Sequence, residues 1–401
     1  MTHYDQDVIV AGAGIAGLAL SASLAQSGLS VLLLEASPRP SSPTLGTDID
    51  QWDRRVSALT PASVGILRRV GAWAHIDPKR IAPYQSMQVW DAEGTGTIEF
   101  EAAEVGVTDL GYIVENRVTV DALLAVVERS SRVRIEWGDG VEGLARDRDG
   151  ITVTTQGEAQ WSAPLLVAAD GARSRLRDMA GFKTRNWSYH QGAIVATVAL
   201  EQSHDGTCFQ AFSATGPVAL LPLADPCLCS IVWSVDDPEW ERLMALDSDG
   251  FTKALNAALA GNAPAVCAIG ERAVFPLHQS HAVDYVTDRL ALVADAAHSI
   301  HPLAGQGINL GLADVGVLAN VVSTAYHDDL DWGKANLLRR YQRRRKTDNL
   351  AMMAAMEAFK RGFGNRHPLA LVARNVGLNW VNQTPLLKRW FAAQALAAEG
   401  L

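Results

Sequence analysis

The sequence is poor in the residues that build thiol or metal chemistry. It holds four cysteines among 401 residues, Cys208, Cys227, Cys229 and Cys267, and their spacing fits neither a disulfide framework nor a zinc site. The spacing Cys227-x-Cys229 is more typical of alternation along a strand than of a metal site. We therefore expect a reducing compartment and chemistry that uses neither thiols nor a metal ion.

Long apolar runs are also missing. No run of eighteen apolar residues occurs, so we expect no membrane-spanning segment. Asp5 and Asp7 precede a short apolar run that ends in glycine, which is typical of a strand rather than an export signal, and we predict a cytoplasmic protein. With 48% hydrophobic residues the chain can bury a substantial core, and its length favours two domains or one large α/β domain with an inserted partner.

The net charge of -9 is unevenly distributed along the chain. Residues 334–401 carry 13 Lys or Arg against 3 Asp or Glu, whereas the rest carries 22 against 41. A basic end on an acidic protein indicates contact with an anionic surface, and solvated helix faces would give the same pattern. We predict no nucleic-acid partner.

The first residues predict a βαβ unit that opens a parallel sheet. Residues 7–11 and 29–34 have the pattern of strands, and residues 15–27 that of a helix, which Gly28 ends. Further helices are expected at 61–70 and 119–129, and strands at 133–137 and 151–155.

A glycine-rich turn joins the first strand to the first helix. Gly12 allows the tight bend, Gly14 lets the backbone approach a pyrophosphate, and Gly17 permits close packing of the helix on the sheet. The helix N-terminus offers unpaired N–H groups to phosphates, and Glu35 can accept hydrogen bonds from ribose hydroxyls. The turn predicts a dinucleotide site, without distinguishing FAD from NAD.

The middle of the chain changes pattern. Apolar strands without regular intervening helices indicate an antiparallel sheet, and they are expected at 193–200, 207–212, 218–223 and 228–233. The sequence thus predicts an α/β (α+β) fold in which a mainly antiparallel substrate domain, residues 186–274, is inserted into a Rossmann-like cofactor domain. The cofactor domain would comprise 1–185 plus 275–335. Residues 336–401 would be helical, with a long helix near 335–360 and shorter ones from 367.

A second glycine-rich segment follows the predicted strand 290–295. Asp295 would end that strand at the carboxyl edge of the sheet, where it can bind the ribityl hydroxyls of a flavin. Pro302, Gly305 and Gly307 would shape a loop against a flat ring, and a helix from Gln306 or Gly307 would direct its positive end there. Two distant segments that hold one long cofactor favour FAD over NAD.

These motifs resemble those of the FAD-dependent aromatic hydroxylases, the single-component flavin monooxygenases. The matching residues are Asp295-Ala-Ala-His298, Pro302, Gly305-Gln306-Gly307 and Asn309, with Ala294 in place of the usual glycine, and Asp170-Gly171 in the middle of the chain. The resemblance implies bound FAD, NAD(P)H as co-substrate and O2, and it implies that Asp170-Gly171 contacts both FAD and NADPH.

The resemblance narrows to the ubiquinone-biosynthesis hydroxylases. It rests on Arg55-Val-Ser-Ala-Leu59, Glu115-Asn-Arg117, the run from His301 to Asp314, and Tyr341-Gln-Arg-Arg-Arg-Lys346. It implies a polyprenyl phenol or quinol substrate, and it places Arg55 and Arg117 near the ribityl and pyrophosphate groups. A membrane-lodged substrate would give the basic C-terminal region a purpose, as a peripheral contact with the inner membrane. A helical cap on the FAD domain, a homo-oligomer contact or a biosynthetic complex are the alternatives.

The predicted FAD site can be summarised by residue. Its members are Gly12, Gly14, Ile15, Ala16, Gly17, Glu35, Arg55, Arg117, Asp170, Gly171, Asp295, Pro302, Gly305, Gln306, Gly307, Ile308 and Asn309. No residue is predicted to be catalytic, because the reactive chemistry of such enzymes belongs to the flavin. The alternatives to a ring hydroxylase are a hydroxylase of another aromatic compound, a flavin-dependent prenyl reductase and a non-catalytic flavoprotein partner.

Overall fold

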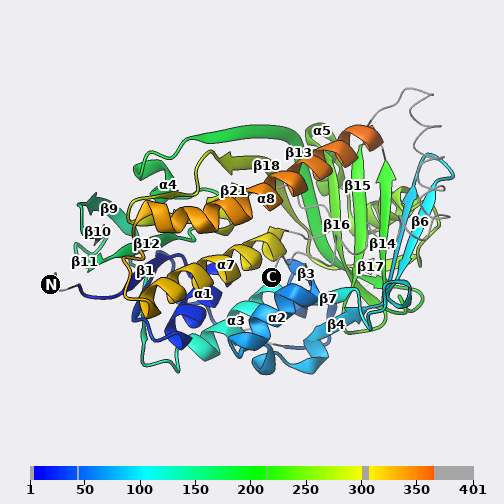
Figure 1. Ribbon diagram of the computed structural model, residues 1–401. Coiled ribbons are helices and arrows are strands. Elements are labelled where there is room, and N and C mark those ends of the chain that lie inside the picture. Colours follow the sequence, from blue (N-terminus) through cyan, green and yellow to red (C-terminus); the bar gives the residue numbers. More distant parts are fainter. Residues whose placement is uncertain (1–3, 43–44, 214, 300–306, 365–401) are drawn as a thin grey trace.

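The computed structural model describes residues 4–42, 45–213, 215–299 and 307–364 (Figure 1). The short helices predicted from residue 367 onward lie outside these ranges. Within them the chain forms a mixed α/β fold of four sheets and eight α-helices. The predicted fold class is confirmed.

A six-stranded, mostly parallel sheet forms the cofactor half of the molecule. Its strands, in spatial order, are β19 (Val286–Thr287), β20 (Leu290–Leu292), β12 (Leu165–Ala168), β1 (Val8–Ala11), β2 (Val31–Glu35) and β8 (Val133–Trp137). Only β19 runs antiparallel to its neighbour. The strands β1, β12 and β20 are buried along their whole length, as expected of a parallel sheet covered on both faces.

Helices and two small sheets surround this parallel sheet. The helices are α1 (Ile15–Gln26), α2 (Pro61–Arg69), α3 (Asn116–Val127), α4 (Arg175–Met179), α7 (Gly307–His327) and α8 (Ala335–Gly364). The small antiparallel sheets are β9 (Val141–Arg146), β10 (Ile151–Thr155) and β11 (Gln160–Ala163), and β3 (Val56–Leu59), β7 (Gly111–Glu115) and β4 (Ile81–Tyr84). α7 packs against α1 on one side and against α8 on the other, so α7 lies between the first and the last described helix (Figure 1).

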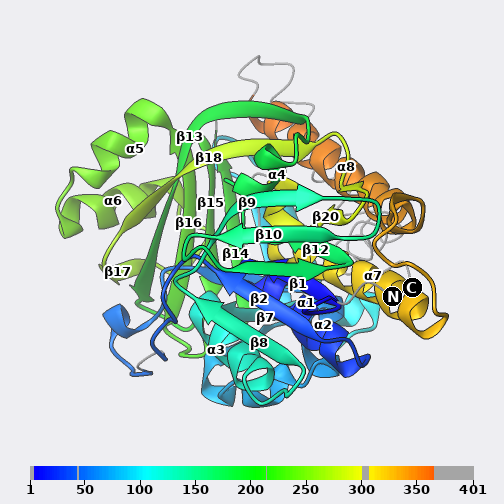
Figure 2. The same cartoon turned by 90° about the vertical axis from the view of Figure 1, so that its left-hand side faces the viewer.

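The second half of the molecule is built on a nine-stranded sheet (Figure 2). Its strands are β21 (His298–Ser299), β18 (Ala273–Ala282), β13 (Thr184–Leu200), β16 (Leu228–Asp236), β15 (Gly216–Pro222), β14 (Thr207–Ser213), β5 (Ser86–Asp91) and β6 (Thr97–Glu101), with β17 (Val266–Ile269) paired to β13. All pairs are antiparallel except β14 with β5. Three of these strands lie wholly outside residues 186–274, and the proposed division into domains stays a prediction.

Two expectations about local structure were wrong. The region predicted to lack helices contains α5 (Asp237–Met244) and α6 (Ser248–Ala258), whose buried Leu243, Phe251 and Leu255 cover one face of the large sheet. The strand predicted at 290–295 stops at Leu292, and Asp295 lies in the following 3-10 turn, Ala294–Ala296.

The helix α7 is long and rich in apolar residues, although polar residues interrupt it. Among the described helices it alone is long and apolar enough to cross a membrane by length and composition, and 56% of that segment is buried inside the protein. Its buried residues Leu312, Val315 and Leu318 belong to the main core. The apolar composition of α7 is therefore explained by its place in the core of the fold.

Candidate functional site

The register of the parallel sheet brings the predicted cofactor segments to one edge. Ala11 at the end of β1 pairs with Leu34 of β2 and with Ala168 of β12, and Ala168 pairs with Leu292 of β20. The candidate residues at or just beyond these strand ends are Gly12, Glu35, Asp170 and Asp295. The carboxyl edge is where open α/β sheets bind ligands, so Gly12 and Asp295, 283 positions apart in the sequence, meet at one site.

The glycines of the first turn have separate structural roles. Gly12 has φ +106°, and a Cβ there would collide with the backbone oxygen of Ala169, beyond the end of β12. A Cβ on Gly17 would collide with the backbone oxygen of Gly12. Gly14, by contrast, is exposed, and a Cβ there would meet nothing within 4 Å. Gly12 and Gly17 are therefore required by packing, while Gly14 leaves room for a ligand.

The start of α1 is prepared for an anion. Gly14 is its N-cap, no side chain caps the helix, and no acidic residue stands in the first turn. Glu35 accepts hydrogen bonds from the backbone N–H of Ala13 (2.7 Å) and of Ser37 (2.9 Å). Each carboxylate oxygen of Glu35 retains lone-pair capacity for a ribose hydroxyl. Ile15 is buried in the core, so its contribution to a ligand is its backbone N–H.

The middle motif supplies a buried acceptor without a partner. Oδ2 of Asp170 accepts a hydrogen bond from the backbone N–H of Leu176 (3.2 Å), whereas Oδ1 is buried and has no hydrogen-bond partner. Burial raises the pKa of Asp170 above its ordinary value. Gly171 has φ +82° and open space where a Cβ would stand. An unpaired acceptor beside open space fits a ligand that donates a hydrogen bond.

The surroundings of Asp295 are those of a concave surface. The side chain of Asp295 is accessible to solvent, but protein atoms surround its carboxyl group. This burial raises the pKa of Asp295, while His298 and Arg55 act in the opposite direction and lower it. A side chain with both properties lines a hollow rather than a convex face. Arg55 also lies over the ring of Phe275, 5.5 Å from guanidinium carbon to ring centroid. Arg55 and Phe275 therefore belong to the neighbourhood of Asp295.

The start of α7 is fixed by the side chain of Asn309. Its Nδ2 donates to the oxygen of Ala58 (2.8 Å), and its Oδ1 accepts from Thr60 N (3.0 Å) and Ser63 Oγ (2.7 Å). This buried side chain joins α7 to the junction of β3 and α2, so a role toward FAD concerns its backbone. Gly307 and Ile308 are half-buried beside it. The predicted members Pro302, Gly305 and Gln306, and His301, lie outside the described residues.

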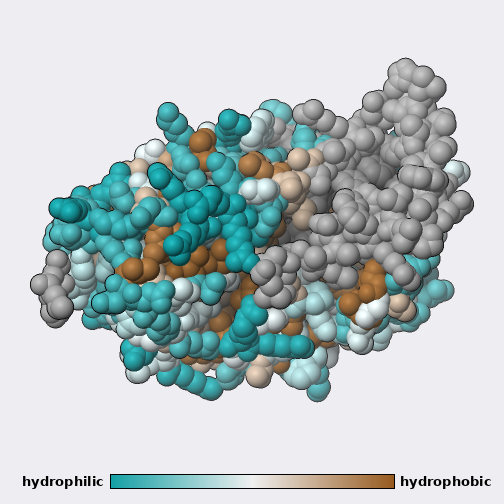
Figure 3. Space-filling model, in the orientation of Figure 1, coloured by the Kyte–Doolittle hydropathy of each residue, from teal (hydrophilic) through white to brown (hydrophobic). Residues whose placement is uncertain are grey.

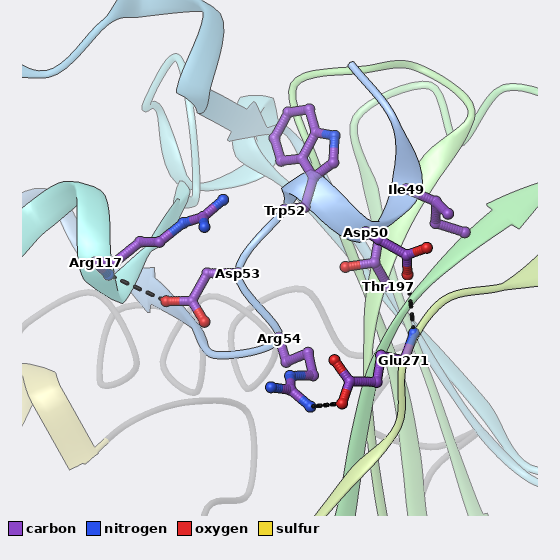
Figure 4. A pocket seen from close by; sticks show the side chains of 8 residues that line it. All are labelled: Ile49, Asp50, Trp52, Asp53, Arg54, Arg117, Thr197 and Glu271. Atoms are coloured by element: carbon purple, nitrogen blue, oxygen red, sulfur yellow. Dashed lines mark hydrogen bonds and ion pairs between the residues drawn. The ribbon is translucent and has the colours of Figure 1, made fainter. Parts of the chain in front are cut away.

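Arg117 lines a polar pocket (Figure 4). Its guanidinium contacts the oxygen of Gln51 and Oε1 of Glu115 (3.2 Å). The pocket has a volume of about 140 Å³ and is lined by Ile49, Asp50, Trp52, Asp53, Arg54, Arg117, Thr197 and Glu271. Three buried polar atoms of this lining have no hydrogen-bond partner: Trp52 Nε1, Arg117 Nε and Thr197 Oγ1. The contact predicted between Arg117 and FAD stays a prediction.

The main feature that the sequence did not predict is a buried polar cluster behind Asp295. Asp314 of α7 lies at its centre, hydrogen-bonded to His298 (2.6 Å) and to Arg345 of α8 (2.9 Å). Arg345 belongs to the basic C-terminal region, but it is only 3% exposed. The available signal was the spacing of Tyr341, Arg345 and Asn349, which places them on one helix face.

Comparison with known proteins decides the family. The model of the FAD binding domain family matches residues 5–356. The chain is 37% identical to the 3-demethoxyubiquinol 3-hydroxylase of Escherichia coli, over 99% of this chain and 100% of that protein. It is also 32% identical to the mitochondrial ubiquinone biosynthesis monooxygenase COQ6 of Homo sapiens, over 97% of this chain and 92% of that protein. The chain belongs to the FAD-dependent monooxygenase family.

Solved structures agree on the fold of this monooxygenase. The p-nitrophenol 4-monooxygenase PnpA of Pseudomonas putida superimposes with a TM-score of 0.78 at 18% identity, covering 98% of this chain and 99% of that one. HpxO of Klebsiella pneumoniae, solved with FAD and uric acid, gives a TM-score of 0.74 at 20% identity, with 97% of each chain covered. The prediction of FAD as the cofactor is confirmed.

Proposed function

We propose that this monooxygenase hydroxylates the aromatic ring of a polyprenyl phenol or quinol precursor in ubiquinone biosynthesis, with NAD(P)H and O2 as co-substrates. The observation that carries the proposal is its similarity over nearly the whole chain to relatives named for that pathway. The carboxyl edge of the parallel sheet provides a matching cofactor site.

The residues at this edge fit the parts of FAD in order. The open Gly14 and the uncapped start of α1 would hold the pyrophosphate, and Glu35 the adenosine ribose. Asp170 Oδ1 and Asp295 would accept hydrogen bonds from flavin-side hydroxyls. When bound there, FAD supplies electron transfer from NAD(P)H and activation of O2.

The large sheet would supply the wall for the substrate ring. Phe275 on β18 is 41% exposed and lies beside Arg55, whose charge reaches Asp295. The exposed aromatic face of Phe275 suits contact with the aromatic ring of the substrate. The neighbouring guanidinium of Arg55 would orient that ring, because it attracts a phenolate oxygen more strongly than an unsubstituted ring position. The role of the protein in this scheme is to orient the ring and to exclude water.

Oxygen incorporation tests the function directly. The purified holoenzyme is given NADPH, labelled O2 and a short-chain polyprenyl phenol, and the product is analysed by mass spectrometry. One labelled oxygen atom per product molecule is expected. A product reduced in its prenyl chain without label would instead identify a flavin-dependent reductase. NADPH oxidation that no phenol stimulates would identify a non-catalytic flavoprotein.

Deleting the gene tests the pathway. The expected result is an accumulating quinone precursor that lacks one hydroxyl group, and the position of that hydroxyl would name the substrate. Unchanged quinone content would overturn the assignment to ubiquinone biosynthesis while leaving a hydroxylase of another aromatic compound in place.

We also propose that α8 and the adjoining surface of α7 contact an anionic membrane surface, where such a precursor resides. The side chains of Arg339, Arg340 and Arg343 are exposed on α8. Half-buried Val317 and Val321 lie on the neighbouring α7. Figure 3 shows hydrophilic residues over α8 beside a band of hydrophobic residues where Figure 1 places α7. Basic and apolar surface side by side suits an anionic interface.

Vesicle sedimentation separates this contact from a purely structural cap. The holoenzyme should sediment with vesicles that contain phosphatidylglycerol, and R339E/R340E should weaken this binding about tenfold or more. The control R242E/K253E reverses two exposed charges on α5 and α6, on the opposite side of the molecule from α8 (Figure 2), and should bind as the parent does. Equal loss in both variants, or no binding by the parent, would refute the contact.

A further inference from the structure

The turn that carries Asp295 is held from behind by one carboxylate. Oδ2 of Asp314 accepts a hydrogen bond from the backbone N–H of Ala294 (3.0 Å) and another from Nε2 of His298 (2.6 Å). These two donors flank Asp295 on either side in the sequence. A single oxygen atom on α7 therefore fixes both ends of the five-residue segment 294–298, which carries Asp295.

The other oxygen of Asp314 is held by α8. Arg345 donates from Nε to Oδ1 of Asp314 (2.9 Å), and Asn349 donates from Nδ2 to the same oxygen (3.3 Å). Arg345 is itself held by Asp348 (3.0 Å) and by the side-chain oxygen of Asn349 (2.9 Å). The carboxylate thus connects α8 to the 294–298 segment through rigid, directional contacts.

The cluster is fully buried and charged. Asp314 is 0% exposed, His298 2% and Arg345 3%. Burial alone would raise the pKa of Asp314, but the charges and hydrogen bonds of His298 and Arg345 lower it below its ordinary value, so the group is a carboxylate. Buried ions carry a desolvation cost of several kcal/mol each, and apolar side chains would join two helices at less cost. The carboxylate of Asp314, unlike an apolar side chain, fixes the orientation of the Ala294 N–H and of the His298 imidazole through directional hydrogen bonds.

We propose that Asp314 is a positioning residue for FAD: through Ala294 and His298 it sets the place of Asp295 at the flavin, and Arg345 makes α8 part of that support. The proposal rests on the assignment of Asp295 to the FAD site. It predicts that FAD affinity depends on side chains that do not touch FAD.

Titration of apoprotein with FAD, followed by fluorescence, measures this dependence. Asp314→Asn keeps the size of the side chain but loses the charge, and it should raise the dissociation constant for FAD about 10- to 100-fold, as expected for a lost charged hydrogen bond. The flavin reduction potential should shift as well, because the position of the Asp295 charge changes. Neither readout responds to a role confined to joining α7 and α8.

A second ion pair with a buried arginine supplies the control. Arg289 is 1% exposed and pairs with Asp331, whose side chain is 43% exposed, through two contacts of 2.5 and 2.7 Å, at the opposite end of β20 from Asp295. Asp331→Asn makes the same chemical change as Asp314→Asn. It should lower the melting temperature of the apoprotein while the dissociation constant for FAD stays within about twofold of the parent value.

Variants of His298 keep the test decisive if Asp314→Asn fails to fold. His298→Gln retains a donor near the position of Nε2 and should bind FAD nearly as the parent does, whereas His298→Leu has no donor and should bind it at least tenfold more weakly. Equal affinity in both His298 variants, or equal loss in Asp314→Asn and Asp331→Asn, would overturn the positioning role. A parent chain that binds no FAD would instead refute the assignment of the cofactor site.

Discussion

Ala294 and Gly311 are in close contact, so the effect of Gly311→Ala on the free energy of unfolding should change sign with the residue at position 294. Ala294 has φ +52°, a left-handed conformation that costs an alanine about 1–2 kcal/mol. A Cβ built on Gly311 of α7 would lie 2.8 Å from the Ala294 methyl carbon, inside the ~3.5–4.0 Å that carbon atoms prefer. The methyl group at 294, where related hydroxylases usually have glycine, thus occupies space that only a glycine at 311 leaves free.

The effect of Gly311→Ala should therefore depend on residue 294. In the parent the added methyl overpacks the contact at a cost of about 1–3 kcal/mol, and improved helix propensity returns about 1 kcal/mol, so the variant should be destabilised. In the Ala294→Gly background the nearest atom becomes Cα of residue 294 at 3.6 Å, an ordinary contact. There Gly311→Ala should stabilise the protein by about 0.5–1 kcal/mol.

Urea unfolding of the four apoproteins measures this coupling. Ala294→Gly alone should leave the free energy of unfolding unchanged or raise it by up to about 1.5 kcal/mol, because the relieved left-handed strain of about 1–2 kcal/mol equals or exceeds the chain-entropy cost of glycine, about 0.4–1 kcal/mol. The coupling free energy between the two sites should be about 1–3 kcal/mol. If Gly311→Ala changes the free energy of unfolding by the same amount in both backgrounds, the packing argument is refuted.

Three further predictions follow from the site and its surroundings. Gly14→Ala should lower the melting temperature of the apoprotein only slightly, because its Cβ meets open space and the change affects only the N-cap of α1. It should weaken FAD binding at least about tenfold, because the methyl group would fill the space where a phosphate approaches, and a titration measures this. Gly17→Ala should destabilise the apoprotein itself, since its Cβ would collide with the oxygen of Gly12; an unchanged melting temperature would contradict this reading. Burial, followed by the electrostatic effects of His298, Lys346 and Arg185, lowers the pKa of His281 to about 4, so the folded chain binds this proton less tightly than the unfolded chain does. Stability is then lost as the pH falls through the window from about 6.5 to 4, by about 1–2 kcal/mol between pH 7 and 5, and His281→Gln should remove this part of the pH dependence in urea unfolding.

The local elements of the cofactor half were accessible from sequence because their signals are short-range. The expected helix at 15–27 and strand at 29–34 correspond to α1 and β2 within two residues at each end. Strands 133–137 and 151–155 were predicted with the observed bounds. In each case the regular spacing of apolar residues predicts the type of element, and the glycine or polar turn that follows predicts where it ends.

Pairings between distant segments were not accessible. The strand β5 joins the large sheet through a parallel ladder with β14, more than one hundred residues later, and no local pattern encodes that partner. The role of Asp314 was missed for the same reason, since its meaning comes from His298 and Arg345 on other elements. Asp295 was identified correctly as a residue at the sheet edge, but its turn conformation depends on Ala294, whose left-handed φ a sequence pattern does not favour.

The strand order of the parallel sheet has a consequence for synthesis of the chain. β1 lies between β2 and β12, so one edge of β1 has no partner until residues 165–168 have been made. At the usual rate of translation that interval lasts roughly ten to thirty seconds, during which an apolar strand edge is open to other chains. β20 and the turn with Asp295 emerge later still. FAD can therefore use the complete site only after residue 295 of 401 has been made, and a chain terminated before residue 290 would leave the ribosome with an open sheet edge that β20 would otherwise cover.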